Sequence, residues 1–251
     1  MLRDTGLPPP RILQELVPIL VPIMAPMLSN QHGAPVDRRN VAEIARALRD
    51  AVTGGVYRPK ERLVEEELAR TFGTNRAVIR GALAALQQEG LVTRERNRGA
   101  HVRLIEPDEA IEILEARAVL EALVARRAAE RIDEDGIQAL TNIVERMGEC
   151  ARSGDLMAYS ELNAGFHAIV LRFGGHSTLQ KLLAQLQSQS VRYQFRTVLA
   201  PGRPANSLAE HQAILAALAR HDPDGAERAA RQHVERVTET LRSFAGHDRL
   251  S

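Results

Sequence analysis

The feature that most constrains the fold is a series of helical segments filling the second half of the chain. Apolar residues recur there at helical spacing, and glycine, proline or aspartate stands at most of the breaks. Short links between helices favour antiparallel neighbours, so this half is expected to form an all-helical antiparallel bundle. The predicted spans are 108–132, 134–152, 155–173, 176–199, 206–220 and 223–245.

The composition agrees with a mainly α protein. Aromatic residues make up 3% of the chain and tryptophan is absent, so a core must be built from Leu, Ala, Val and Ile, which suits helices better than a sheet sandwich. Cys150 is the single cysteine, which excludes an internal disulfide and predicts a reducing, cytoplasmic location.

The first 36 residues are rich in proline. Pro18, Pro22 and Pro26 interrupt an apolar run that is too short to span a bilayer. We interpret residues 1–36 as a flexible arm, or as the product of a start codon assigned too far upstream. A signal-like segment is the alternative.

Residues 37–105 carry the pattern of a winged helix-turn-helix domain. Three helices are expected over 41–52, 65–72 and 76–89, followed by strands over 91–93 and 100–104 that enclose a basic, glycine-containing stretch. Residues 38–104 hold 14 basic and 8 acidic residues, whereas the rest of the chain holds 19 and 24. A basic segment at residues 38–104 in a chain that is otherwise acidic favours contact of that segment with a polyanion such as DNA.

The third helix is the expected recognition helix, because its first residues reach base edges in the major groove. Those residues are Asn75, Arg76 and Arg80, and the two arginines share one helix face. Arg98 and Gly99 at the hairpin tip place a cation and bare backbone against the minor groove or phosphates. The alternative is a solvated helix face without a DNA-binding role.

Four polar residues of the bundle, residues 106–251, suggest a metal site. Asn163 and His167 are four apart on one helix face. His211 and His233 lie at equal distances from Asp222, so an antiparallel hairpin turning there brings them level. Three imidazoles and an oxygen donor can hold a divalent metal with an open position, although core histidines without a metal remain the alternative.

Arg117 is the candidate anchor for an anion. It shares an apolar stripe with Ile113, Leu120 and Val124, and a buried guanidinium needs a partner such as a ligand carboxylate. An internal salt bridge to Glu161 or Glu121 is the alternative. Arg192 and Arg196, on a polar face with Gln185 and Gln189, are weaker candidates.

The N-terminal part resembles the GntR family of bacterial regulators. The matching residues are Gly55-Val56-Tyr57-Arg58-Pro59, Arg62 to Ala69, Gly73 to Arg80, Ala82 to Leu86, Glu89-Gly90-Leu91-Val92 and Arg98 to Val102. The resemblance implies DNA binding. It adds Glu66 to the candidate DNA-binding residues Asn75, Arg76, Arg80, Arg98 and Gly99. Lys60 stands where the family usually has glycine, Asn75 replaces Ser or Thr, Val78 replaces Pro or Thr, and Gly81 replaces a common glutamate.

The bundle resembles the FCD branch of that family. The matching stretches are Arg117 to Glu121, Leu162 to His167, Glu210 to Leu215 and Ala226 to His233. The resemblance implies that three histidines and an aspartate hold zinc, nickel or a similar ion, which helps to bind a small carboxylate. His167, His211 and His233 match the histidines, Asn163 takes the usual place of the aspartate, and Arg117 matches the anchor.

These observations predict a homodimeric transcriptional regulator, more commonly a repressor, that binds a palindromic DNA operator and responds to a small organic acid. The alternatives are a helical metalloenzyme and a constitutive DNA-binding protein whose body only dimerises. Against an enzyme, the sequence has no His-Glu-x-x-His, P-loop or Gly-x-Ser-x-Gly motif, and no carboxylate accompanies the histidines as an obvious general base.

Overall fold

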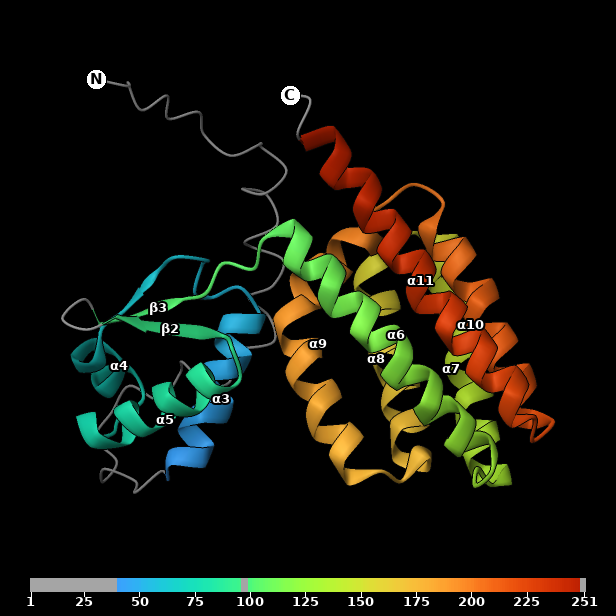
Figure 1. Cartoon of the computed structure of the whole chain (residues 1–251), viewed down its shortest axis with the longest axis horizontal. Helices are drawn as coiled ribbons and strands as arrows, with labels where there is room; N and C mark the ends of the chain where they lie inside the picture. The colour runs from blue at the N-terminus through green and yellow to red at the C-terminus, as the bar shows by residue number, and fades with distance from the viewer. Residues whose placement is uncertain (1–39, 96–98, 249–251) are drawn as a thin grey trace. The chain divides into compact units, whose positions relative to one another are not determined.

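A computed structural model describes residues 40–95 and 99–248 of the chain (Figure 1). These residues divide between Leu104 and Ile105 into two compact units. The predicted mainly α fold, with a winged helix-turn-helix ahead of a helical bundle, is confirmed. The proline-rich arm at 1–36 and Arg98 lie outside the described residues. None of the described helices has the length and apolar character that a membrane span requires.

The described residues of the N-terminal unit, 40–95 and 99–104, form three helices and a small antiparallel sheet. Its elements are α3 (Val41–Thr53), β1 (Arg62–Leu63), α4 (Glu65–Thr71), α5 (Arg76–Gln88), β2 (Val92–Glu95) and β3 (Gly99–Val102). The strand order is β1-β3-β2, with Val92 opposite Val102 and Leu63 opposite Ala100. The short strand β1 is not expected from the sequence, because two residues are too few to show an alternating pattern.

Local sequence explains where the helices of this unit begin and pack. Asn40 and Glu43 form a reciprocal capping box at the start of α3. Ile44 of α3 and Leu83 of α5 are fully buried in one core. A Cβ at Gly81 would lie 3.0 Å from two side-chain carbons of Val41, so glycine, where the family usually has glutamate, permits close packing of α3 on α5.

The C-terminal unit consists of long helices joined by short links. They are α6 (Pro107–Ala129), α7 (Glu134–Ser153), α8 (Leu156–Gly174), α9 (Ser177–Val198), α10 (Arg203–Ala219) and α11 (Pro223–Asp248). Figure 1 shows α6 and α11 side by side along the bundle. Fully buried core residues include Ala125, Leu140, Phe166 and Leu218.

The predicted helices of the bundle match the structure to within three residues at each end. The largest difference at a helix start is in α10, which begins at Arg203 rather than at 206. Gly202 adopts φ 76° at the cap, and Pro204 in the first turn is compatible with a helix because that turn has no internal N–H partner to lose.

Candidate metal centre and nucleic-acid interface

The structure brings the three candidate histidines together inside the bundle. His167 is on α8, His211 on α10 and His233 on α11, and their candidate ligand nitrogens all lie within 4.8 Å of one another. The ring centroids of His211 and His233 are 4.5 Å apart, and each lies 5.3 Å from that of His167. Asn163 is partly exposed on α8, one turn before His167.

Hydrogen bonds fix the tautomers of two of these histidines. His211 Nδ1 donates to the backbone carbonyl of Ser207 at 2.6 Å, and His233 Nδ1 donates to Glu210 Oε2 at 2.7 Å. Because a carbonyl and a carboxylate only accept, Nδ1 carries the proton in both rings and Nε2 keeps its lone pair. His167 Nδ1 similarly faces Glu121 Oε2 at 3.5 Å.

The electrostatics of the cluster suit a metal. Burial lowers the pKa of His167 below its ordinary value, and it lowers the pKa of both His211 and His233 much further. The imidazoles are therefore neutral near pH 7, the form that binds a metal. Among the described residues, His211 Nε2 is a buried side-chain atom that has no hydrogen-bond partner. An orphaned lone pair beside two further imidazoles fits a divalent cation.

Two carboxylates lie beside the histidines, which were expected to have no carboxylate near them as an obvious general base; both carboxylates face imidazole Nδ1 atoms. Glu121 lies beside His167 and Glu210 beside His233. Burial opposes ionisation of Glu121, but the charge of Arg117 and the hydrogen bonds that it donates outweigh burial and lower the pKa of Glu121. Both glutamates reach the cluster from positions that sequence reasoning did not place in the site.

Arg117 is 2% exposed and has internal partners. Its Nη2 and Nε donate to Glu121 Oε1 at 2.6 and 2.9 Å, and its Nη1 donates to Ser190 Oγ at 3.1 Å. The amide oxygen of Gln194, in the orientation that satisfies both groups, accepts from Nη2 at 2.8 Å. Of the two salt bridges considered from the sequence, the structure contains the one to Glu121, whereas Glu161 is exposed.

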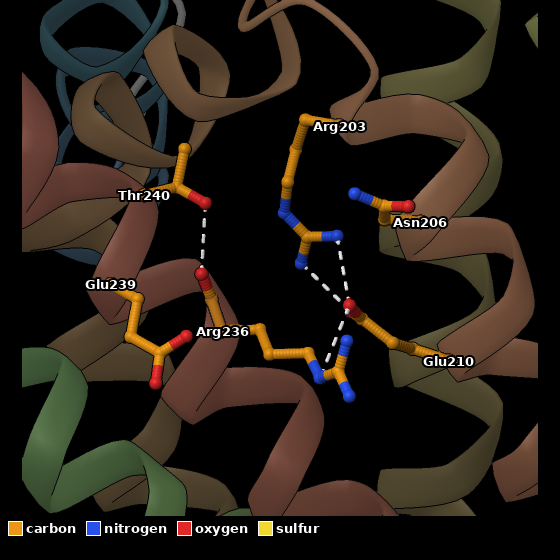
Figure 2. Close-up of a pocket in the computed structure, with 6 residues that line it drawn as sticks. All are labelled: Arg203, Asn206, Glu210, Arg236, Glu239 and Thr240. Carbon is orange, nitrogen blue, oxygen red and sulfur yellow. Dashed lines mark hydrogen bonds and ion pairs between the residues drawn. The ribbon is translucent and has the colours of Figure 1, made fainter.

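Glu210 also forms one wall of a polar cavity of about 140 Å³ between α10 and α11 (Figure 2). Arg203, itself buried, donates to both oxygens of Glu210 at 3.1 and 2.8 Å. Arg236 reaches the same carboxylate from α11, with Nε 3.9 Å from Oε1. Glu210 therefore connects this cavity to His233 and the histidine cluster.

The residues expected to contact DNA lie on the N-terminal unit. Arg76 and Arg80 stand on the first turns of α5 with side chains 64% and 58% exposed. Asn75 is the N-cap of α5, and its Oδ1 accepts from the backbone N–H of Ala77 and Val78 at 3.0 Å. That oxygen holds the helix start, which leaves the amide nitrogen as the atom able to donate to a phosphate.

The remaining DNA-binding candidates are less closely grouped. Glu66 is exposed on α4, and Gly99 begins β3 with φ 84°, a conformation that favours glycine. The neighbouring Glu65 was missed by sequence reasoning, yet it lies within ion-pair distance of Arg76, Arg80 and Arg94. Three consecutive glutamates give no sequence signal that tells which of them faces the arginines.

Comparison with known proteins covers both units. Residues 40–102 match the model of bacterial regulatory proteins of the gntR family, and residues 112–236 match the FCD domain. The Escherichia coli HTH-type transcriptional repressor RspR is 26% identical over 202 residues, covering 80% of this chain and 89% of the relative. A putative L-lactate dehydrogenase operon regulatory protein of the same bacterium is 29% identical over 240 residues, covering 84% and 90%.

Solved structures share the fold. A putative GntR regulator from Rhodococcus sp. RHA1 has a TM-score of 0.65 at 20% identity, covering 81% of this chain and 97% of that one. Escherichia coli McbR/YncC has a TM-score of 0.70 at 17% identity, covering 85% and 100%. The two family matches together, in this order along the chain, exclude the metalloenzyme alternative. The chain belongs to the GntR family of DNA-binding transcriptional regulators, in the branch that carries an FCD domain.

Proposed function

We propose that a divalent metal at the histidine cluster helps to bind a small carboxylate, and that this ligand controls DNA binding by the regulator. In this proposal residues 37–105 bind the operator and residues 106–251 bind metal and effector and form a homodimer. The observation that carries it is the set of three neutral imidazoles whose Nδ1 atoms face acceptors, with His211 Nε2 left unpaired in a buried position.

The proposed ligands are His167, His211 and His233, with the amide oxygen of Asn163 as a fourth. Nitrogen-rich sites of this kind favour zinc or nickel over calcium or magnesium. A neutral amide oxygen binds a cation more weakly than a carboxylate does. The histidines therefore supply most of the affinity, and a coordination position stays open for an effector oxygen.

Arg117 is the proposed anchor for the effector carboxylate. Its guanidinium already binds the carboxylate of Glu121, and a position that holds one carboxylate suits another oxyanion. Glu121 also faces His167, so one carboxylate lies between the anchor and the metal ligands. An effector that pairs with Arg117 must displace or rearrange Glu121 and thereby changes the packing of α6 against α8. The name of one relative associates that protein with an L-lactate dehydrogenase operon, which makes lactate the first acid to test.

The proposed DNA-binding residues are Asn75, Arg76, Arg80, Arg98, Gly99 and Glu66. In a homodimer two copies of α5 would enter successive major grooves of a palindromic operator. An effector that prefers a different arrangement of the DNA-binding units releases the operator, and coupling of this kind amounts to about 1–3 kcal/mol. We propose that the protein represses transcription and that the effector relieves this repression.

The test is the melting temperature of chelator-treated protein after addition of zinc, nickel or manganese, followed by small carboxylates. A ligand at a hundredfold excess over Kd stabilises the folded state by about 2.7 kcal/mol. We expect His211→Ala to abolish the metal shift and Arg117→Ala to abolish the carboxylate shift, while His101→Ala, outside the bundle, keeps both. If no metal shifts the melting temperature of the wild-type protein, the proposed metal site is wrong. Residues 106–251 then bind the effector without a metal or serve only to form the dimer.

A further inference from the structure

One carboxylate lies among the arginines of the proposed DNA-binding face. Glu65, in the first turn of α4, has its carboxylate oxygens 3.7 Å from Arg76 Nη2, 3.8 Å from Arg80 Nε and 3.7 Å from Arg94 Nη2. These arginines come from two elements, α5 and β2, and Glu65 belongs to a third. Its side chain is 23% exposed, whereas those of Arg76 and Arg80 are more than half exposed.

An acidic group at this place opposes DNA binding in general. It repels phosphates, and it attracts the guanidinium groups on which contact with phosphate depends. A phosphate at a random DNA site must therefore compete with Glu65 for each arginine. At the operator, bidentate bonds from arginine to base edges supply additional binding energy that random sequence does not.

We propose that Glu65 is a specificity-determining residue: it holds Arg76, Arg80 and Arg94 together and suppresses their binding to DNA of random sequence. The inference rests on the proposed assignment of this face to DNA. In the operator complex the arginines bind base edges, and in this proposal they keep their contact with Glu65 there. Removal of the carboxylate then mainly frees them to bind the phosphates of random DNA, so affinity for random DNA rises more than affinity for the operator. Specificity is a difference between two affinities, and it falls when the weaker one improves.

Glu67 provides a matched control for the charge. It lies in the same first turn of α4 and is exposed, so its replacement removes the same charge and the same favourable interaction with the helix N-terminus. Among the described residues, it forms no ion pair with Arg76, Arg80 or Arg94. A difference between Glu65→Gln and Glu67→Gln therefore reports the arginine contacts and not the net charge.

The experiment measures fluorescence anisotropy of the full-length protein with two duplexes over a series of salt concentrations. One duplex carries an operator selected from a random library, and the other is its scrambled sequence. Relative to Glu67→Gln, we expect Glu65→Gln to lower the ratio of operator to scrambled affinity about tenfold. The salt dependence of binding to scrambled DNA should steepen by about one unit for each additional phosphate that the variant neutralises.

Equal ratios in Glu65→Gln and Glu67→Gln, with unchanged melting temperatures, would overturn the inference. A separate pair of variants tests the face itself. Arg76→Ala should lose operator binding, whereas Arg46→Ala, an exposed arginine of α3, should keep it. If the Arg76 and Arg46 variants bind the operator equally, the proposed DNA-binding face is wrong. If Arg76→Ala alone loses binding, the face stands whatever Glu65→Gln shows.

Discussion

Glu210 and His233 are joined by a hydrogen bond of 2.7 Å, from Nδ1 of the imidazole to Oε2 of the carboxylate. Because the bond fixes the tautomer and orientation of His233, we expect Glu210→Gln to weaken metal binding about 10- to 100-fold. The amide that Glu210→Gln introduces would keep one acceptor oxygen for Arg203 but would lose the second oxygen and the negative charge, which leaves a buried guanidinium poorly paired. Isothermal titration of chelator-treated protein with zinc measures the change.

Glu239→Gln is the control for that measurement. Glu239 lines the same cavity and is exposed, and its replacement makes the same change in net charge. Equal zinc affinities for the Glu210 and Glu239 variants would show that Glu210 does not orient His233.

Buried Arg117 and partly buried Glu121 form an ion pair, and each partner depends on the other. Arg117→Met leaves the Glu121 carboxylate, 13% exposed, without its main partner. Breaking a fully buried pair costs about 3–5 kcal/mol, so we expect a loss at or below the lower end of that range. The double variant Arg117→Met with Glu121→Gln should recover part of that loss, because no unpaired charge remains. Urea unfolding of the single and double variants measures the coupling. Strictly additive losses would contradict the pairing.

The histidine cluster could be predicted in part from sequence because a helical hairpin is symmetric about its turn. His211 and His233 lie equally far from Asp222, and the structure brings their rings to 4.5 Å. The same symmetry places Glu210 opposite His233, so the sequence does hold a signal for this carboxylate. Helix boundaries followed from glycine, proline and aspartate at the breaks, since these residues act locally.

The position of Glu121 could not be obtained in this way. Its contact with His167 joins α6 to α8, whose relative rotation depends on packing of the whole core. The convergence of Arg76, Arg80 and Arg94 on Glu65 likewise depends on the angle between α4 and α5 and on the path of β2. Sequence periodicity defines the face of one helix but does not specify side-chain directions between helices.

Lys60 adopts φ 67°, in the left-handed region that favours glycine, and the family usually has glycine there. A non-glycine residue in this region costs about 1–2 kcal/mol, whereas glycine loses about 0.5–1 kcal/mol more chain entropy on folding. Since the Lys60 side chain is exposed, we expect Lys60→Gly to raise the free energy of unfolding by about 0.5–1 kcal/mol. Chemical denaturation measures it. Lys60→Ala keeps the Cβ and should give no gain; an equal gain would rule out relief of backbone strain.

Acid should destabilise the metal-free protein through the histidine cluster. Burial lowers the pKa of His167, His211 and His233 in the folded state, so the folded protein binds fewer protons than the unfolded chain below about pH 6.5. The free energy of unfolding therefore falls as the pH decreases through that value. Urea unfolding with chelator at about pH 7.5 and 5.5 tests this, and both values lie above the ordinary pKa values of Asp and Glu. Burial raises the pKa of Glu210 above its ordinary value, so Glu210→Gln is measured alongside. His211→Gln removes one of the lowered groups and should make the dependence shallower. A wild-type protein equally stable at both values would show that the folded and unfolded states bind equal numbers of protons, which would contradict the lowered pKa values of the three rings.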